Sequence, residues 1–139
     1  MENVWILEVA QMPKVKIDIM EGRTAEHKKQ LLNLVHDALV ESIKIPDYDR
    51  TQILNEHKPD HFERPPGKTD LYTSIEIIMF PGRSLEAKRN LYRAIARNLK
   101  TIGIDENDIM VILIEPAMEN WGIQGKPATD MDLGFKIDV

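Results

Sequence analysis

Apolar and polar residues alternate near the start of the chain. Val15, Ile17 and Ile19 are separated by Lys16 and Asp18, and this period of two predicts a β-strand with one buried face. A period of three to four follows, which predicts a helix with one apolar side. Its apolar positions are Leu31, Leu34, Val35, Ala38 and Leu39. A second strand is predicted over residues 51–56, after a break at residues 46–49.

The ends of this first helix carry residues that helices favour there. Thr24 is suited to the N-cap, and Glu26 in the first turn complements the positive end of the helix dipole. Gly22 permits the sharp turn that leads into the helix, and Pro46 ends it. The predicted order is strand, glycine–arginine turn, helix, short loop and strand, which is a βαβ unit.

The same motif occurs a second time. Gly22, Arg23, Glu26, Lys28 and Leu31 recur at a constant spacing as Gly82, Arg83, Glu86, Lys88 and Leu91. Strands are predicted over residues 72–80 and 109–114, and Ser84 is suited to cap the helix between them. The apolar positions of that helix are Leu91, Ile95, Leu99 and Ile102, and Gly103 is suited to end it.

Two βαβ units in tandem predict an α/β (α+β) fold. Parallel strands joined by a helix cross over right-handedly, so we expect a four-stranded sheet with both helices on one face. The chain is predicted to be a single domain, 1–139. Residues 1–12 form an N-terminal extension, in which residues 4–9 could be a strand. Residues 13–57 and 72–116 are the two units, and 117–139 a C-terminal segment.

The face of the sheet away from the helices is predicted to be apolar as well. Ile78, Phe80, Ile112 and Ile114 all fall on predicted strands, and two helices cannot cover both faces of a sheet. We therefore expect an obligate homo-oligomer in which other subunits bury this second face.

Composition excludes several classes of function. The net charge of −5 argues against a nucleic-acid partner, and the absence of cysteine excludes disulfides and thiolate chemistry. No apolar run approaches the roughly 20 residues that span a bilayer, which predicts no membrane partner. The first residues lack a basic signal-peptide region, so we expect a cytoplasmic protein.

Four short segments together resemble the tautomerase superfamily, whose members include 4-oxalocrotonate tautomerase, malonate semialdehyde decarboxylase and macrophage migration inhibitory factor. The first segment is Pro13 opening a strand ahead of EGRT at residues 21–24. The others are PDYDR at 46–50, PGRS at 81–84 and NWGIQGKPA at 120–128. The doubled βαβ length, PDYDR and PGRS are most similar to the malonate semialdehyde decarboxylase-like branch.

The resemblance implies a homotrimer that needs no cofactor and no metal, acting on a small-molecule carboxylate. It implies catalysis by an amino-terminal proline, here Pro13, as general base. It further implies that Arg83 holds the substrate carboxylate, that Asp49 orients a water or the substrate carbonyl, and that Trp121 forms an aromatic wall. Arg23 occupies the position that small members use for substrate. In the doubled branch the second copy does this work, which favours a structural role for Arg23.

Two departures bear on the reaction. The decarboxylase pattern has Arg-Pro-Arg where this chain has Pro81-Gly82-Arg83, so one of two arginines is missing. This favours a tautomerase of a small 2-oxo acid over a decarboxylase or hydratase of 3-oxo acids. Pro13 also follows twelve residues. If these residues remain attached, the nitrogen of Pro13 is an amide without basicity. This possibility supports the alternative of a non-catalytic oligomer. A translation start at Met12 would expose the amine.

Each site residue also has a plain structural interpretation. Pro13 could simply begin a strand, and Asp49 could simply form a turn. Trp121 could be interface packing, and Arg23 could pair on the surface with Glu21 or Glu26.

The histidines predict no metal site. His57 and His61 are four apart, but Pro59 between them prevents a helix that would place both on one side. His27 and His36 lie on the first predicted helix, and we expect both to be solvated.

Overall fold

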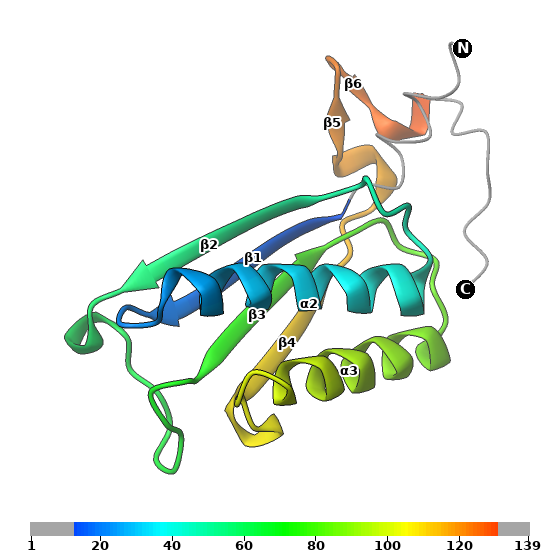
Figure 1. Ribbon diagram of the computed structural model, residues 1–139. Helices are drawn as coiled ribbons and strands as arrows, with labels where there is room; N and C mark the ends of the chain where they lie inside the picture. Colours follow the sequence, from blue (N-terminus) through cyan, green and yellow to red (C-terminus); the bar gives the residue numbers. More distant parts are fainter. Residues whose placement is uncertain (1–12, 131–139) are drawn as a thin grey trace.

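The computed structural model describes residues 13–130, and the predicted strand at residues 4–9 and the last nine residues lie outside this range. The larger elements in chain order are β1 (Lys14–Met20), α2 (Ala25–Ile43), β2 (Thr51–His57), β3 (Thr73–Ile78), α3 (Leu85–Lys100) and β4 (Ile109–Ile114). β5 (Gly122–Ile123) and β6 (Lys126–Pro127) form a small hairpin after β4. The two predicted βαβ units are confirmed, with both helices on one face of the sheet (Figure 1).

The sheet has the strand order β2-β1-β3-β4. β1 is parallel to β2, and β3 is parallel to β4, as the βαβ units require. The two units meet where β1 runs antiparallel to β3, with Lys14 opposite Ile78 and Asp18 opposite Ser74. The beginning of β1 therefore lies beside the end of β3, and the end of β1 lies beside the beginning of β3.

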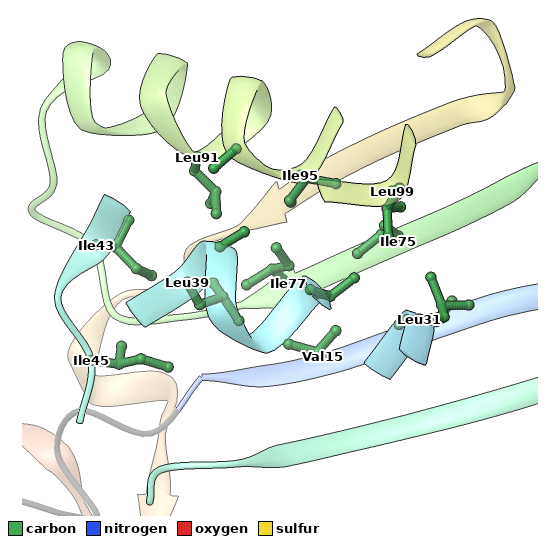
Figure 2. Close-up of a cluster of buried hydrophobic side chains, with 14 of the residues drawn as sticks. Val15, Leu31, Leu39, Ile43, Ile45, Ile75, Ile77, Leu91, Ile95 and Leu99 are labelled. Carbon is green, nitrogen blue, oxygen red and sulfur yellow. The ribbon is translucent and has the colours of Figure 1, made fainter. Parts of the chain in front are cut away.

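The core lies between the sheet and the two helices. Val15, Ile17 and Ile19 alternate towards the helices, as the period of two predicts, and each is at most 1% exposed. Leu31 and Leu39 of α2 and Leu91, Ile95 and Leu99 of α3 converge on them and on Ile75 and Ile77 of β3 (Figure 2). Full burial of one such side chain contributes about 1.5–3 kcal/mol, so this layer is the main source of stability.

Local sequence signals set the helix boundaries. Oγ1 of Thr24 accepts a hydrogen bond from the amide of His27 (3.0 Å), and Oγ of Ser84 accepts one from Ala87 (3.1 Å). At the end of α3, Gly103 has φ 86°, and the amide of Ile104 donates to the carbonyl of Leu99 at 3.1 Å. Both predicted N-caps and the predicted glycine stop are thus confirmed.

The uncovered face of the sheet is apolar along β4. Met110, Ile112 and Ile114 are 46%, 47% and 37% exposed. Phe80 does not share this face, contrary to the sequence prediction, because β3 ends at Ile78 and the ring of Phe80 is buried beneath Trp121.

His36 is not solvated, so the prediction was wrong for this residue, and His27 is only partly exposed. His36 is 1% exposed, and its Nε2 donates to the carbonyl oxygen of Asp47 at 2.8 Å. His27 is half-buried, and its Nε2 is 3.0 Å from the carbonyl oxygen of Ile102. Each ring forms a hydrogen bond to a carbonyl oxygen in a loop, after α2 for His36 and after α3 for His27. Residue spacing on a helix does not predict such contacts.

Candidate active site

One end of the sheet gathers most of the residues that the sequence singled out. Pro13 directly precedes β1, and Asp49 lies two residues before β2, which runs parallel to β1 with Lys14 opposite Thr51. Because β3 is antiparallel to β1, it ends at this same edge and leads into the turn that carries Arg83. The β5–β6 hairpin stands over this end (Figure 1).

Pro13 is buried at the first position of the described chain. Its φ is restricted by the ring and it lacks an amide hydrogen, so the position before a strand suits it. Because β1 is a central strand between β2 and β3, Pro13 faces neighbouring chain on both sides rather than an open edge.

Asp49 is held in a turn and is 4% exposed. Its amide donates to the carbonyl oxygen of Pro46 at 3.0 Å, which closes the turn predicted at residues 46–49. Two residues of helix α2 hold the turn in place. His36 donates a hydrogen bond to the carbonyl oxygen of Asp47, and Oδ1 of Asn33 accepts one from Nη2 of Arg50 at 3.0 Å. The turn that carries the carboxylate is therefore attached to the core by the helix.

Arg83 lies half-buried in the turn between β3 and α3. Its Nη1 donates to the carbonyl oxygen of Phe80 at 3.3 Å, while its Nε is buried and has no hydrogen-bond partner within residues 13–130. Burial lowers the pKa of the Arg83 guanidinium, and the carboxylates of Glu115 and Asp49 offset part of this shift. A guanidinium with unused donors in a partly desolvated place is suited to bind a carboxylate through two parallel hydrogen bonds.

Trp121 forms an apolar wall with Phe80 at the same end. The two ring centroids are 4.7 Å apart and the rings are tilted by 74°, an edge-to-face arrangement. Nε1 of Trp121 donates to the carbonyl oxygen of Pro116 at 3.0 Å, and the carbonyl of Trp121 accepts from Ala128 at 2.9 Å. Met118 and Ile123 pack against this pair, so the ring is held in one orientation.

Two charged residues at this end were given no role by the sequence. Glu115 directly follows β4, and its Oε1 accepts a hydrogen bond from Nζ of Lys88 at 2.6 Å. The first unit contains a similar pair, because Lys28, the repeat equivalent of Lys88, is bonded at 2.8 Å to Glu56 near the end of β2. The proximity of Glu115 to Arg83 could not be predicted from residue spacing, because it arises from the register between β3 and β4.

Arg23 lies at the opposite end of the sheet and is not brought together with Pro13. Its Nη2 donates to the carbonyl oxygen of Tyr72 at 3.3 Å and to Oγ1 of Thr73 at 3.2 Å. This differs from the predicted surface pairing with nearby glutamates, because the turn directs the side chain across the sheet to β3. Burial lowers the pKa of Arg23, and Asp108 partly offsets the shift.

Asp108 precedes β4 as Asp49 precedes β2, and it is 3% exposed and accepts hydrogen bonds from both the amide and the hydroxyl of Thr69. Burial acts to raise the pKa of Asp108. The bonds from Thr69 and the positive charges of Lys68 and Arg64 outweigh burial and lower the pKa. This carboxylate is therefore ionised and fully used in holding the chain between the two units.

Within residues 13–130 no group of three or more histidine or acidic side chains could hold a metal ion. His57 pairs instead with Asp18, at 2.7 Å between Nε2 and Oδ1. In the same part of the chain, neither helix is both long and apolar enough to cross a membrane.

Comparisons with known proteins agree with this architecture. Two family models, each described as a tautomerase enzyme, match residues 49–124 and 13–66. The probable tautomerase YrdN of Bacillus subtilis (strain 168) is 29% identical over 115 residues, which cover 79% of this chain and 89% of that protein.

Two solved structures extend the comparison. FG41 malonate semialdehyde decarboxylase, inhibited by 3-bromopropiolate, is 31% identical with a TM-score of 0.72 over 78% of this chain and 86% of that one. The Q0 fused 4-OT, a symmetric trimer, is 26% identical with a TM-score of 0.72 over 83% and 95%. Since one family model covers more than half of the 139 residues and a relative above 30% identity covers most of them, the chain belongs to the tautomerase family.

Proposed function

We propose that this protein is a cofactor-independent tautomerase that interconverts the keto and enol forms of a small 2-oxo acid. The observation that carries this proposal is the convergence of three features at one end of the sheet. They are Pro13 before β1, the half-buried Arg83 guanidinium with unused donors, and the apolar wall of Trp121 and Phe80.

Pro13 is the proposed general base, once it is the first residue. An amino-terminal amine has a pKa of about 7.7–8.0, and burial beside a cation disfavours its protonated form. The amine takes the hydroxyl proton of the enol, and the oxygen electrons form the carbonyl. The electrons of the former carbon–carbon double bond then take a proton from the Pro13 ammonium. Base and proton are both restored at the end of the cycle.

The other residues hold the substrate during this transfer. Arg83 binds the carboxylate in a two-point fork, and the carboxylate of Asp49 positions the carbonyl end or a water. Trp121 closes the apolar side, which keeps water away from the enol. Holding the substrate by its carboxylate places the reacting carbon at a constant distance from the base.

The test is ketonisation of phenylenolpyruvate and 2-hydroxymuconate, followed by absorbance, with two forms of the protein. One form begins at Pro13 and the other retains residues 1–12. We expect turnover by the first form, and Pro13→Ala should lower it by about 10²–10⁴-fold, the range for loss of a general base. Full turnover by Pro13→Ala would refute the assignment.

A decarboxylase or hydratase of 3-oxo acids is the second candidate, because FG41 malonate semialdehyde decarboxylase is among the similar structures. Release of carbon dioxide from malonate semialdehyde distinguishes it from a tautomerase. A non-catalytic oligomer is the third candidate. It would show no turnover of any of these substrates, and 3-bromopropiolate would leave Pro13 unmodified, as measured by intact mass.

We further propose that the protein acts as a homotrimer. The exposed row of Met110, Ile112 and Ile114 on the uncovered face of β4 favours burial against other subunits, and the Q0 fused 4-OT is a trimer. Sedimentation at micromolar concentration should give the mass of three chains, and a monomeric mass would contradict the proposal.

A further inference from the structure

An ion pair between Lys88 and Glu115 lies at the same end of the sheet as the proposed carboxylate site. Nζ of Lys88 and Oε1 of Glu115 are 2.6 Å apart, and the two side chains are only 25% and 21% exposed. A pair this short and this sheltered is screened less than a surface pair. Lys88 projects from the beginning of α3, and Glu115 follows the end of β4.

Strand register places Glu115 beside the turn that carries Arg83. Ile78 is opposite Ile114, and the amide of Met79 donates to the carbonyl of Ile114 at 2.9 Å. Glu115 is therefore next to the residues that lead into Arg83, and its charge acts on that guanidinium. Nevertheless, within residues 13–130 Arg83 forms no direct ion pair, and its only hydrogen bond is to Phe80.

A free carboxylate next to an arginine would bind it. A guanidinium and a carboxylate form a fork of two hydrogen bonds, and such a bond within the chain would occupy the donors that a substrate carboxylate needs. Lys88 removes this competitor because it engages Glu115 from the helix side. The charge of the pair is also close to zero, so Glu115 offsets less of the positive field of Arg83, and Asp49 is the other carboxylate that acts on that guanidinium.

We propose that Lys88 is a positioning residue that holds Glu115 away from Arg83 and so keeps Arg83 free for the carboxylate of the substrate. The inference rests on the proposed function only in taking Arg83 as the carboxylate site. It assigns to Lys88 an effect on the affinity for the carboxylate, and no part in proton transfer.

The first βαβ unit supplies a matched control. Lys28 and Glu56 are the equivalent pair, 2.8 Å apart, with side chains 26% and 35% exposed. The arginine of that unit, Arg23, bonds through Nη2 to Tyr72 and Thr73 and lies at the opposite end of the sheet from Arg83. Loss of Lys28 therefore removes a similar ion pair at a similar depth without exposing the proposed site to a competing carboxylate.

The experiment measures binding of pyruvate, a small 2-oxo acid, to the full chain by NMR titration of the arginine side-chain resonances. We expect Lys88→Gln to weaken binding about tenfold, the effect of leaving a sheltered charge without its partner, and Lys28→Gln to leave it unchanged. The double variant Lys88→Gln/Glu115→Gln should restore affinity to within about twofold, because the competitor is gone. Thermal unfolding of the two single variants checks that both lose a similar amount of stability.

Three results would overturn the inference. They are unchanged affinity in Lys88→Gln, equal weakening in Lys28→Gln, and failure of the double variant to recover. Absence of pyruvate binding to the wild-type chain would also overturn it, since Arg83 would then not be free. Because this readout requires no turnover, it is separate from the proposed reaction. A chain that binds pyruvate as described but lacks tautomerase activity refutes the reaction and leaves the role of Lys88 standing.

Discussion

Arg83 and Arg23 occupy equivalent turns of the two βαβ units, each directly before a helix. At the Arg23 end Nη2 bonds to Tyr72 and Thr73, while Nε and Nη1 of Arg23 are buried without a partner within residues 13–130, and the nearby Asp108 is engaged by Thr69. At the Arg83 end one bond reaches Phe80, and Nε of Arg83 has no partner within residues 13–130.

The difference between the two ends comes from the segments that follow each unit. The chain after the first unit returns across the Arg23 end and supplies Tyr72, which accepts a hydrogen bond from Arg23, and Thr69, which donates to Asp108. The chain after the second unit brings Trp121 over the Arg83 end, which adds an apolar wall but no hydrogen bond to the arginine. A duplicated motif thus places the same cation twice, and the neighbours of each cation decide which hydrogen bonds it forms and whether an apolar wall lies beside it.

The largest expected effect is the contrast between Arg83→Gln and Arg23→Gln. Arg83→Gln should lower kcat/KM by about 10²–10³-fold with little change in stability, because it removes the charge proposed to bind the substrate carboxylate. Arg23→Gln should lower the free energy of unfolding by about 2 kcal/mol, because it removes hydrogen bonds in a partly buried place. Steady-state kinetics and urea unfolding of both variants measure the contrast, and equal kinetic losses would contradict it.

The second effect concerns Asp108 and its dependence on pH. Asp108→Asn should lower the free energy of unfolding by about 1–3 kcal/mol at pH 7, because a carboxylate that accepts two hydrogen bonds is lost. The folded pKa of Asp108 lies below the ordinary value, so its stabilisation is complete above an unfolded pKa of about 3.9 and disappears as the pH falls through the folded pKa. The difference from wild type should therefore shrink below about pH 4 in urea unfolding curves. A difference that stays constant down to pH 2 would show that the charge of Asp108 is not responsible.

The smallest expected effect concerns amide hydrogen exchange in the two loops that carry Asp49 and Asp108. His36 bonds to the first loop, while the equivalent helix position in the second unit is Ala96. His36→Leu should accelerate amide hydrogen exchange at residues 47–50 by about fivefold, the effect of losing one hydrogen bond worth about 1 kcal/mol. The turn at residues 105–108 serves as the internal reference and should be unchanged. Equal acceleration in both turns would indicate general loosening of α2 rather than loss of support for Asp49.

Much of the fold could be predicted from residue order because its signals are local. Alternation at Val15, Ile17 and Ile19, the caps at Thr24 and Ser84, and the stop at Gly103 each depend on residues within a few positions of one another. The repeat then implied that both units share one architecture. These elements can therefore be predicted from short stretches of sequence, without knowledge of distant contacts.

The candidate site depends on contacts that short stretches do not specify. Antiparallel pairing of β1 with β3 is what places Pro13 beside the turn of Arg83, and no spacing along the chain encodes which strands become neighbours. Packing of the loop after α2 buries His36 beside Asp47, and the parallel pairing of β3 with β4 brings Glu115 near the turn of Arg83. The sequence by itself determined the two units and the arginine in each. Only the tertiary structure decided what surrounds each arginine, with Tyr72 and Thr73 at Arg23 and Phe80 at Arg83, because burial and hydrogen-bond partners are properties of neighbours in space.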